Sequence, residues 1–208
     1  MTNFATVDEA LSDIKKGKML ILVDHPKREN EGDFYIPTDF VNPSHLMTMI
    51  RLGGGLICCA ITDAQRERLS LPLMVDPLEN DEKTHISFTI SVNAKEGVTT
   101  GVSAYDRNKT IKVLGNPNAK PTDLVRPGHV FSLVAKEAGV LERPGHTEAA
   151  VDLAKLAHLN PSGVICEIIK DDGHMAKLPG LISLSQKLRI KILPIDRLIT
   201  YRRSNKNI

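Results

Sequence analysis

The sequence of 208 residues contains no tryptophan, and only 4% of its residues are aromatic. A core must therefore be built mainly from aliphatic side chains. No apolar stretch approaches the roughly 18 residues that a membrane span requires. Residues 1–4 also lack the basic segment and apolar core that open a secretory signal. These absences predict a cytoplasmic protein with no membrane partner.

Cysteine content and net charge are both low. Cys58, Cys59 and Cys166 lie in apolar runs, with an odd total and no Cys-x-x-Cys spacing. This pattern excludes a disulfide framework or a zinc site and indicates a reducing compartment. The 27 basic and 25 acidic residues leave a formal charge of +2, so no nucleic-acid partner is expected.

The chain length fits one domain, which we assign to residues 1–200. Residues 201–208 are locally basic. They are interpreted as a C-terminal tail, either a frayed end or a link into a further domain in a longer relative.

Helical and extended patterns alternate along the chain and predict a layered α/β protein of the α+β type with a mixed, twisted sheet. Thr6 and Glu9 form a capping box, and Asn42 followed by Pro43 starts a second helix. Helices are predicted at 6–17, 43–52, 63–69, 104–114, 147–157 and 180–188. Strands are predicted at 18–24, 34–41, 56–61, 85–92, 129–135, 163–169 and 190–193.

A charged segment, Arg28-Glu29-Asn30-Glu31-Gly32-Asp33, follows the first apolar strand. In an extended chain Glu29, Glu31 and Asp33 point to one side. Carboxylates this close together are costly without a counter-ion, and their oxygens are ligands that Mg²⁺ prefers. Arginine is suited to a phosphate or sugar oxygen. The segment predicts a divalent-cation site, with a solvated acidic turn as the alternative.

The tetrapeptide Arg-Pro-Gly-His occurs twice, at 126–129 and at 143–146. Tight turns of this kind aim side chains at a site instead of packing them into a core. His146 also precedes a predicted helix, whose free N–H groups favour a bound phosphate, with Arg143 and Thr147 beside it. The alternative is that both are ordinary turns in which each histidine caps a backbone group.

Glu167 interrupts an apolar strand pattern, Val164-Ile165-Cys166 before it and Ile168-Ile169 after it. It faces either solvent or an interior cleft. A carboxylate in a cleft is a candidate for proton transfer.

These motifs and several others occur in a defined order over nearly the whole chain. They are Asp24 with the segment 28–33, Gly55-Leu56-Ile57-Cys58, Phe88-Thr89-Ile90-Ser91-Val92, residues 97–107, the two Arg-Pro-Gly-His turns, residues 145–154, and Gly163-Val164-Ile165-Cys166-Glu167. Each is weak alone, but the ordered set closely resembles the 3,4-dihydroxy-2-butanone 4-phosphate synthase family of riboflavin biosynthesis.

The resemblance implies a lyase that converts ribulose 5-phosphate to 3,4-dihydroxy-2-butanone 4-phosphate and formate, with Mg²⁺ as cofactor and Mn²⁺ as a substitute. It implies a single-domain, three-layer αβα fold and a homodimer with its active site near the subunit boundary. The implied metal ligands are Glu29 and His146, and the implied catalytic residues are His129, Glu167 and Asp33. The implied substrate-binding residues are Arg28, Glu29, Asp33, Arg143, Pro144, Gly145, His146, Thr147 and Glu167.

Some features leave room for other interpretations. Where family members usually have Gly-Thr-Ala, this chain has His85-Ile86-Ser87, so a substrate contact from that run is not carried over. Cys58 either lines the pocket or is a small buried hydrophobe. Another metal-dependent sugar-phosphate lyase or isomerase would use similar residues, and a non-catalytic nucleotide-binding module on a similar fold would need a wide basic face. Lys18 and Lys170 lie at the ends of predicted strands, which disfavours a Schiff-base aldolase.

Overall fold

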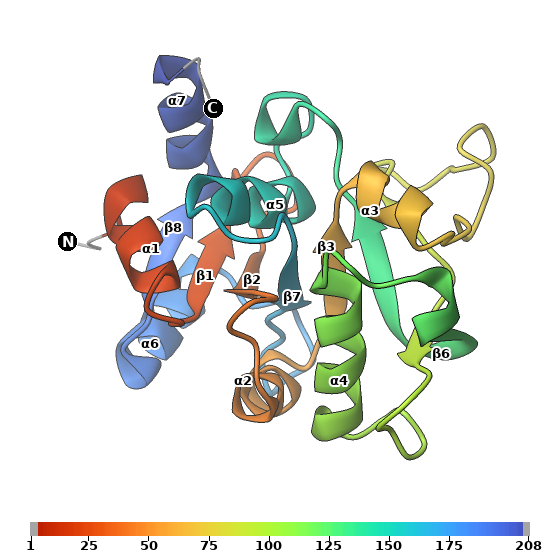
Figure 1. The fold of residues 1–208 in the computed structure, drawn as a ribbon. Coiled ribbons are helices and arrows are strands. Elements are labelled where there is room, and N and C mark those ends of the chain that lie inside the picture. The colour runs from red at the N-terminus through yellow and green to blue at the C-terminus, as the bar shows by residue number, and fades with distance from the viewer. Residues whose placement is uncertain (1–3, 206–208) are drawn as a thin grey trace.

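The computed structural model describes residues 4–205, and a mixed eight-stranded sheet organises them (Figure 1). The strand order is β4-β6-β3-β7-β2-β1-β8, with β5 paired to β6. The β1–β8 and β3–β6 pairs are parallel and the others antiparallel. The strands are β1 (Leu20–Val23), β2 (Gly32–Pro37), β3 (Cys58–Ile61), β4 (Ser87–Phe88), β5 (Val92–Ala94), β6 (Leu124–Val134), β7 (Gly163–Glu167) and β8 (Lys191–Pro194).

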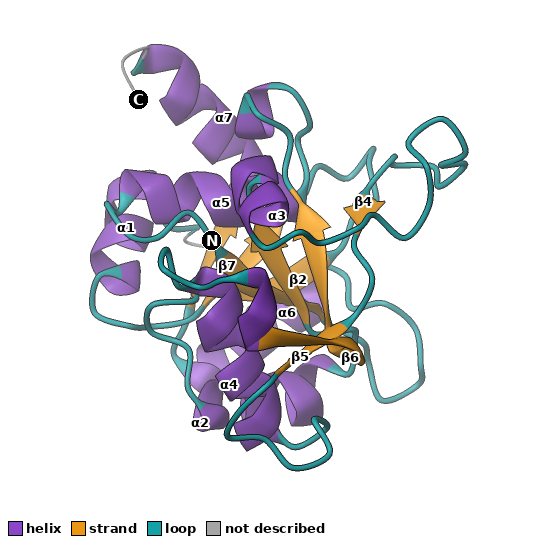
Figure 2. Cartoon of the chain, turned by 45° about the vertical axis from the view of Figure 1, so that its right-hand side comes forward, coloured by secondary structure: helices purple, strands orange, loops and turns teal. Residues whose placement is uncertain are grey.

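Helices cover both faces of the sheet, as Figure 2 shows. One face packs against α1 (Val7–Ile14), α5 (His146–Leu156) and α7 (Ile195–Ser204). The other packs against α2 (Pro43–Thr48), the π-helical turn η1 (Met49–Gly53), α4 (Ala104–Gly115) and α6 (Leu178–Leu188). The remaining helices are α3 (Asp63–Arg68) and the short 3₁₀ turns η2 (Pro121–Asp123) and η3 (Gly139–Leu141). The predicted three-layer αβα architecture is confirmed.

Strand β1 shows why both layers form. Leu20 and Leu22 point into the core beneath α1 and α5, whereas Ile21 and Val23 point into the opposite core. A strand buried on both faces reads as a continuous apolar run, because successive side chains alternate between the faces.

The predicted helix starts are also confirmed. Thr6 and Glu9 form the reciprocal capping box at α1, and the Asn42 side chain accepts from two backbone N–H groups at the start of α2. These side chains satisfy amide donors that have no partner inside the helix.

Three strand predictions were wrong in detail. The strand predicted at 34–41 ends at Pro37, the one predicted at 85–92 is divided between β4 and β5, and β6 begins at Leu124 instead of residue 129. Strand β6 is longer because its pairing with β5 continues past a register shift: Val92 pairs with Val130, but Asn93 pairs with Val125. Residues 126–129, which include a cis Arg126–Pro127 bond, therefore bulge out of β6.

The C-terminal region contains a helix that the sequence patterns did not predict. Helix α7 includes residues 201–204 of the expected tail, and residues 206–208 of that tail lie outside the described residues. Within residues 4–205, no helix combines the length and the apolar character that crossing a membrane requires.

Candidate active site

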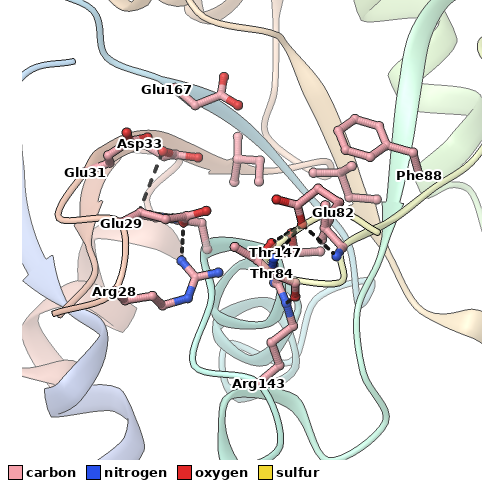
Figure 3. A pocket seen from close by; sticks show the side chains of 14 residues that line it. Arg28, Glu29, Glu31, Asp33, Glu82, Thr84, Phe88, Arg143, Thr147 and Glu167 are labelled. Atoms are coloured by element: carbon pink, nitrogen blue, oxygen red, sulfur yellow. Dashed lines mark hydrogen bonds and ion pairs between the residues drawn. The ribbon is translucent and has the colours of Figure 1, made fainter. Parts of the chain in front are cut away.

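A cavity of about 170 Å³ opens where the loop between β1 and β2, the start of α5, the end of β7 and the segment before β4 meet (Figure 3). The figure shows four carboxylates, those of Glu29, Glu31, Asp33 and Glu167, on one side and Arg143 with Thr84 on the other. The lining residues are Arg28, Glu29, Glu31, Asp33, Glu82, Thr84, Ile86, Phe88, Leu133, Arg143, His146, Thr147, Ile165 and Glu167.

Asp24 organises the charged loop at the end of β1. Its carboxylate accepts hydrogen bonds from the backbone N–H groups of Glu29 at 3.0 Å and Glu31 at 2.8 Å, and from Arg28 Nη1 at 3.0 Å. Burial by itself would raise the pKa of Asp24, but these hydrogen bonds and the nearby His146 lower it overall. Asp24 was missing from the predicted site, although its position directly after a buried strand was a usable signal.

His146 begins α5 and is buried, with 7% of its surface exposed. Its Nδ1 lies 4.0 Å from Glu29 Oε2, and its Nε2 lies 3.8 Å from Asp33 Oδ1. Asp24, Glu29 and His146 offer ligand atoms that all lie within 4.8 Å of one another. The structure therefore brings together the two predicted metal ligands and adds a third candidate.

Within residues 4–205, two buried atoms of this cluster have no hydrogen-bond partner, namely Asp33 Oδ1 and His146 Nε2. Buried polar atoms are rarely left unpaired unless a water, an ion or a ligand completes them. Carboxylate oxygens with one imidazole nitrogen suit a hard divalent cation that keeps some of its water. The residues present fit Mg²⁺.

Burial shifts the pKa values of His146 and Asp33 in opposite directions. Burial lowers the pKa of His146 to about 4, and the charges of Arg28 and Arg143 add to this effect against the opposing pull of Asp24. Burial also raises the pKa of Asp33 well above its usual value, with Glu167, Glu29 and other carboxylates adding to the shift. His146 is therefore neutral at physiological pH, with a lone pair available to a metal.

The second Arg-Pro-Gly-His turn places a fixed guanidinium at the pocket. Arg143 pairs with the buried Glu148 at 2.7 Å and donates to Thr84 through Nε at 2.9 Å and Nη2 at 2.7 Å. A Cβ at Gly145 would come within 3.1 Å of Arg28 Nη2 and closer still to Arg143 Nη1. Glycine at this position lets two guanidinium groups approach the N-terminus of α5, which favours an anion.

The other predicted residues of this turn also lie at the site. Thr147 is buried in the first turn of α5 and lines the cavity, whereas Pro144 is exposed beside Gly145 and does not line it. Glu82, Thr84 and Glu148 were not predicted, because only tertiary contacts reveal their relation to Arg143. Ile86, from the run that departs from the family pattern, lines the cavity.

Glu167 ends β7 directly opposite Asp33 in the β2–β7 register. Its Oε2 accepts a hydrogen bond from the backbone N–H of Leu56 at 2.8 Å, which leaves its other oxygen for the cavity. Of the two alternatives for this side chain, solvent or an interior cleft, the structure shows the cleft, and Asp33 and Glu167 form a pair of carboxylates on adjacent strands.

His129 is the one predicted catalytic residue that the structure does not bring to this cavity. It is exposed in the bulge of β6 and contacts Asn93, and it is absent from the cavity lining. Cys58 is buried with 2% exposure in the apolar core and does not line the cavity either.

Candidate metal ligands therefore lie beside two arginines at a helix N-terminus, an arrangement suited to a divalent cation together with an anion such as a phosphate. Residues 8–201 match the sequence pattern of the family described as 3,4-dihydroxy-2-butanone 4-phosphate synthase, and the chain belongs to that family.

Relatives of known identity agree with this assignment. The chain is 52% identical over 200 residues to the riboflavin biosynthesis protein RibBA of Aquifex aeolicus, covering 96% of the chain and 49% of the relative. It is 48% identical over 205 residues to the probable bifunctional riboflavin biosynthesis protein RIBA 2, chloroplastic, of Oryza sativa, covering 99% and 37%. The chain thus spans about half the length of these relatives or less.

Solved structures match the fold closely. A crystal structure of 3,4-dihydroxy-2-butanone 4-phosphate synthase in complex with two magnesium ions is 32% identical, with a TM-score of 0.92 and coverage of 99% of this chain and 100% of that one. The two-domain synthase RibBX of A. baumannii is 46% identical, with a TM-score of 0.93 and coverage of 98% and 59%.

Proposed function

We propose that this chain converts ribulose 5-phosphate to 3,4-dihydroxy-2-butanone 4-phosphate and formate in a magnesium-dependent reaction that supplies the four-carbon unit of riboflavin. The observation that carries the proposal is the convergence of Glu29 and His146, as metal ligands, with the Asp33–Glu167 carboxylate pair in one cavity. Family membership and the magnesium complex of a relative support it.

Glu29 and His146 would hold the Mg²⁺ ion, with Mn²⁺ as a substitute and with Asp24 close enough to assist. When bound, the ion would act as a Lewis acid toward the ketose oxygens of the substrate. A neutral His146 suits this role because a protonated imidazole has no free lone pair.

The arginines give the substrate its orientation. Arg28 and Arg143 flank Gly145 at the N-terminus of α5, so a phosphate held there would receive guanidinium and backbone N–H donors together. Thr147 adds a hydroxyl in the same turn. A phosphate held there would leave the carbon chain of the substrate facing the four carboxylates.

Asp33 and Glu167 would move protons at the substrate carbons. Enolising a ketose requires a base at a carbon-bound proton, and the later loss of water requires an acid. The raised pKa of Asp33, caused mainly by burial, suits a carboxyl group that holds a proton and passes it on. Glu167 lies opposite Asp33 on the neighbouring strand, so the two can serve different carbons of the same substrate.

A homodimer would complete the site. His129 is exposed outside the cavity of its own chain, so its expected acid–base role requires that it reach the cavity of a second subunit. Val102, Tyr105 and Val125 are exposed apolar residues on the segments that surround Asn93 and His129. Exposed apolar side chains of this kind are typical of subunit interfaces.

Two further proposals concern the extent of the catalytic domain and the compartment of the protein. We infer that residues 1–200 act as the catalytic domain and residues 201–208 as its basic tail, whether or not a further domain follows as in the longer relatives. Three free, buried cysteines are consistent with a reducing compartment such as the cytoplasm.

The test is to incubate the purified protein with uniformly ¹³C-labelled ribulose 5-phosphate, with Mg²⁺ or with EDTA, and to follow products by ¹³C NMR. The proposal predicts formate and a four-carbon phosphate with Mg²⁺ and neither with EDTA. Isomeric five-carbon phosphates without formate would indicate an isomerase. No product under either condition would indicate a non-catalytic binding module.

A further inference from the structure

The first Arg-Pro-Gly-His turn depends on one side chain from the neighbouring strand. Between the pairs Val92–Val130 and Asn93–Val125, residues 126–129 have no regular strand partners. Asn93 is buried, with 8% exposure, and its side chain spans this gap. It contacts both the backbone and the imidazole of His129.

The two contacts identify the atoms of the Asn93 amide. The backbone N–H of His129 can only donate, and it lies 2.8 Å from Asn93 Oδ1, so the oxygen faces this N–H group. The other amide atom, Nδ2, lies 3.2 Å from His129 Nδ1. An amide NH₂ group has no acceptor capacity. His129 Nδ1 must therefore accept, and an accepting ring nitrogen carries no proton.

The Asn93 side chain is closely enclosed. A Cβ at Gly101 would collide with the Asn93 amide, and a Cβ at Gly128 would overlap the backbone of Val92 and Asn93. Asp106 fixes the Gly101 segment by accepting from the N–H groups of Thr99 and Gly101 at 3.1 Å each. Close packing therefore confines the amide beside His129, and the donor at the His129 backbone decides which amide atom faces which group.

We propose that Asn93 is a positioning residue that holds neutral His129 in the tautomer with its proton on Nε2. Among the described residues, Nε2 has no hydrogen-bond partner, so it is the nitrogen that can serve a substrate. Neutral His129 thus offers the substrate a hydrogen bond from its Nε2–H group. This inference rests on the proposed function for its catalytic consequence, but the tautomer itself can be measured without substrate.

The direct test is ¹⁵N NMR of the histidine rings at about pH 8.5, where an ordinary imidazole is neutral. The His129 signals are assigned by their loss in His129→Gln. Wild-type protein should show a protonated Nε2 and an unprotonated Nδ1. In Asn93→Asp an oxygen replaces the NH₂ group, so the proton should move to Nδ1. A wild-type ring protonated at Nδ1, or a tautomer unchanged in Asn93→Asp, would overturn the inference.

Activity measurements separate positioning from simple support of the bulge. Asn93→Asp keeps the acceptor for the His129 N–H, so its melting temperature should stay near wild type while kcat falls about 100-fold, with KM changed less than about twofold. Ser91→Ala is the matched control, because Ser91 Oγ accepts only from the Gly128 N–H at 3.2 Å. It should leave the tautomer and kcat unchanged.

The outcomes also distinguish this inference from the proposed function. Wild-type protein that forms no formate contradicts the proposed function, and the NMR result still decides the tautomer. A tautomer that moves in Asn93→Asp without any loss of kcat would overturn the catalytic part of the inference. Equal losses of kcat in Ser91→Ala and Asn93→Asp would show that Asn93 only supports the bulge.

Discussion

The two Arg-Pro-Gly-His turns have the same sequence and opposite environments. His146 is buried at the start of α5 among Asp24, Glu29 and Asp33. His129 is exposed in a bulge of β6, where its backbone N–H and its ring both contact Asn93. The same tetrapeptide thus has a different backbone and different surroundings in its two places, a bulge in a strand and the entry to a helix, so local sequence alone decides neither.

The arginines of the two turns differ in the same way. Arg143 pairs with a buried carboxylate and lines the cavity. Arg126 donates to two backbone carbonyls, those of Leu69 at 2.8 Å and Ser70 at 3.2 Å, and does not line the cavity. One arginine is placed to bind an anion, and the other ties β6 to the end of α3.

Replacing each histidine by alanine should give the largest difference between the two turns, in activity and in metal affinity. His146→Ala and His129→Ala should each lower kcat/KM by about 1,000-fold, because each removes a group that acts on the substrate. His146→Ala should also lose affinity for the metal, and so should Glu29→Ala, so that excess Mg²⁺ restores little activity to either. His129→Ala should keep its metal affinity. Titration with Mn²⁺, followed by electron paramagnetic resonance, measures that affinity. Equal loss of metal affinity in all three variants would contradict the division of roles.

Replacing each arginine by lysine should give a smaller difference, in KM for the substrate. Arg143→Lys should raise KM for ribulose 5-phosphate about 10- to 100-fold, because lysine lacks the planar fork that meets Glu148, Thr84 and a phosphate together. Arg126→Lys should leave KM unchanged and lower the melting temperature slightly. A similar rise in KM for both variants would show that the two turns do not differ as described.

The buried carboxylates beside His146 should lower the stability of the folded protein, whereas His129 has no such surroundings. Asp33→Asn should abolish activity and stabilise the metal-free protein by about 1–2 kcal/mol at pH 8, because it removes a buried carboxylate surrounded by others. Chemical denaturation measures this difference, and Asp171→Asn, at an exposed position, is the control with no expected change.

The sign of the pH dependence follows from the raised pKa of Asp33. The folded protein holds this proton at pH values where the unfolded chain has released it, so the destabilisation is greatest above the folded-state pKa, shrinks as pH falls below it, and is gone below the unfolded-state pKa. The stability gap between Asp33→Asn and wild type should therefore shrink on acidification. A gap that widens would contradict the assigned environment of Asp33.

Much of the fold could be predicted because its signals are local. Capping residues and apolar periodicity identified the starts of α1 and α2 and the core strand β1. The extension of β6 back to Leu124 could not be predicted, because it depends on pairing with β5 beyond a register shift. Helix α7 was missed because its basic residues mask the apolar positions Ile195 and Leu198.

The candidate site divides along the same line. Glu29, His146 and Glu167 could be proposed as site residues from the sequence alone, because each is a polar residue at the end of a strand, before a helix or within an apolar run. Asp24 and Glu148 were missed, since their importance lies in what they hold in three dimensions. The location of His129 outside the cavity likewise depends on the bulge in β6.

The central claim is that the two turns serve one site from two subunits. The most direct test mixes His129→Ala and His146→Ala subunits by joint unfolding and refolding, and then measures formate. Each mixed dimer would contain one site with both histidines intact, so a 1:1 mixture should regain about a quarter of wild-type activity, although each variant alone is inactive. A mixture as inactive as its components would contradict the claim.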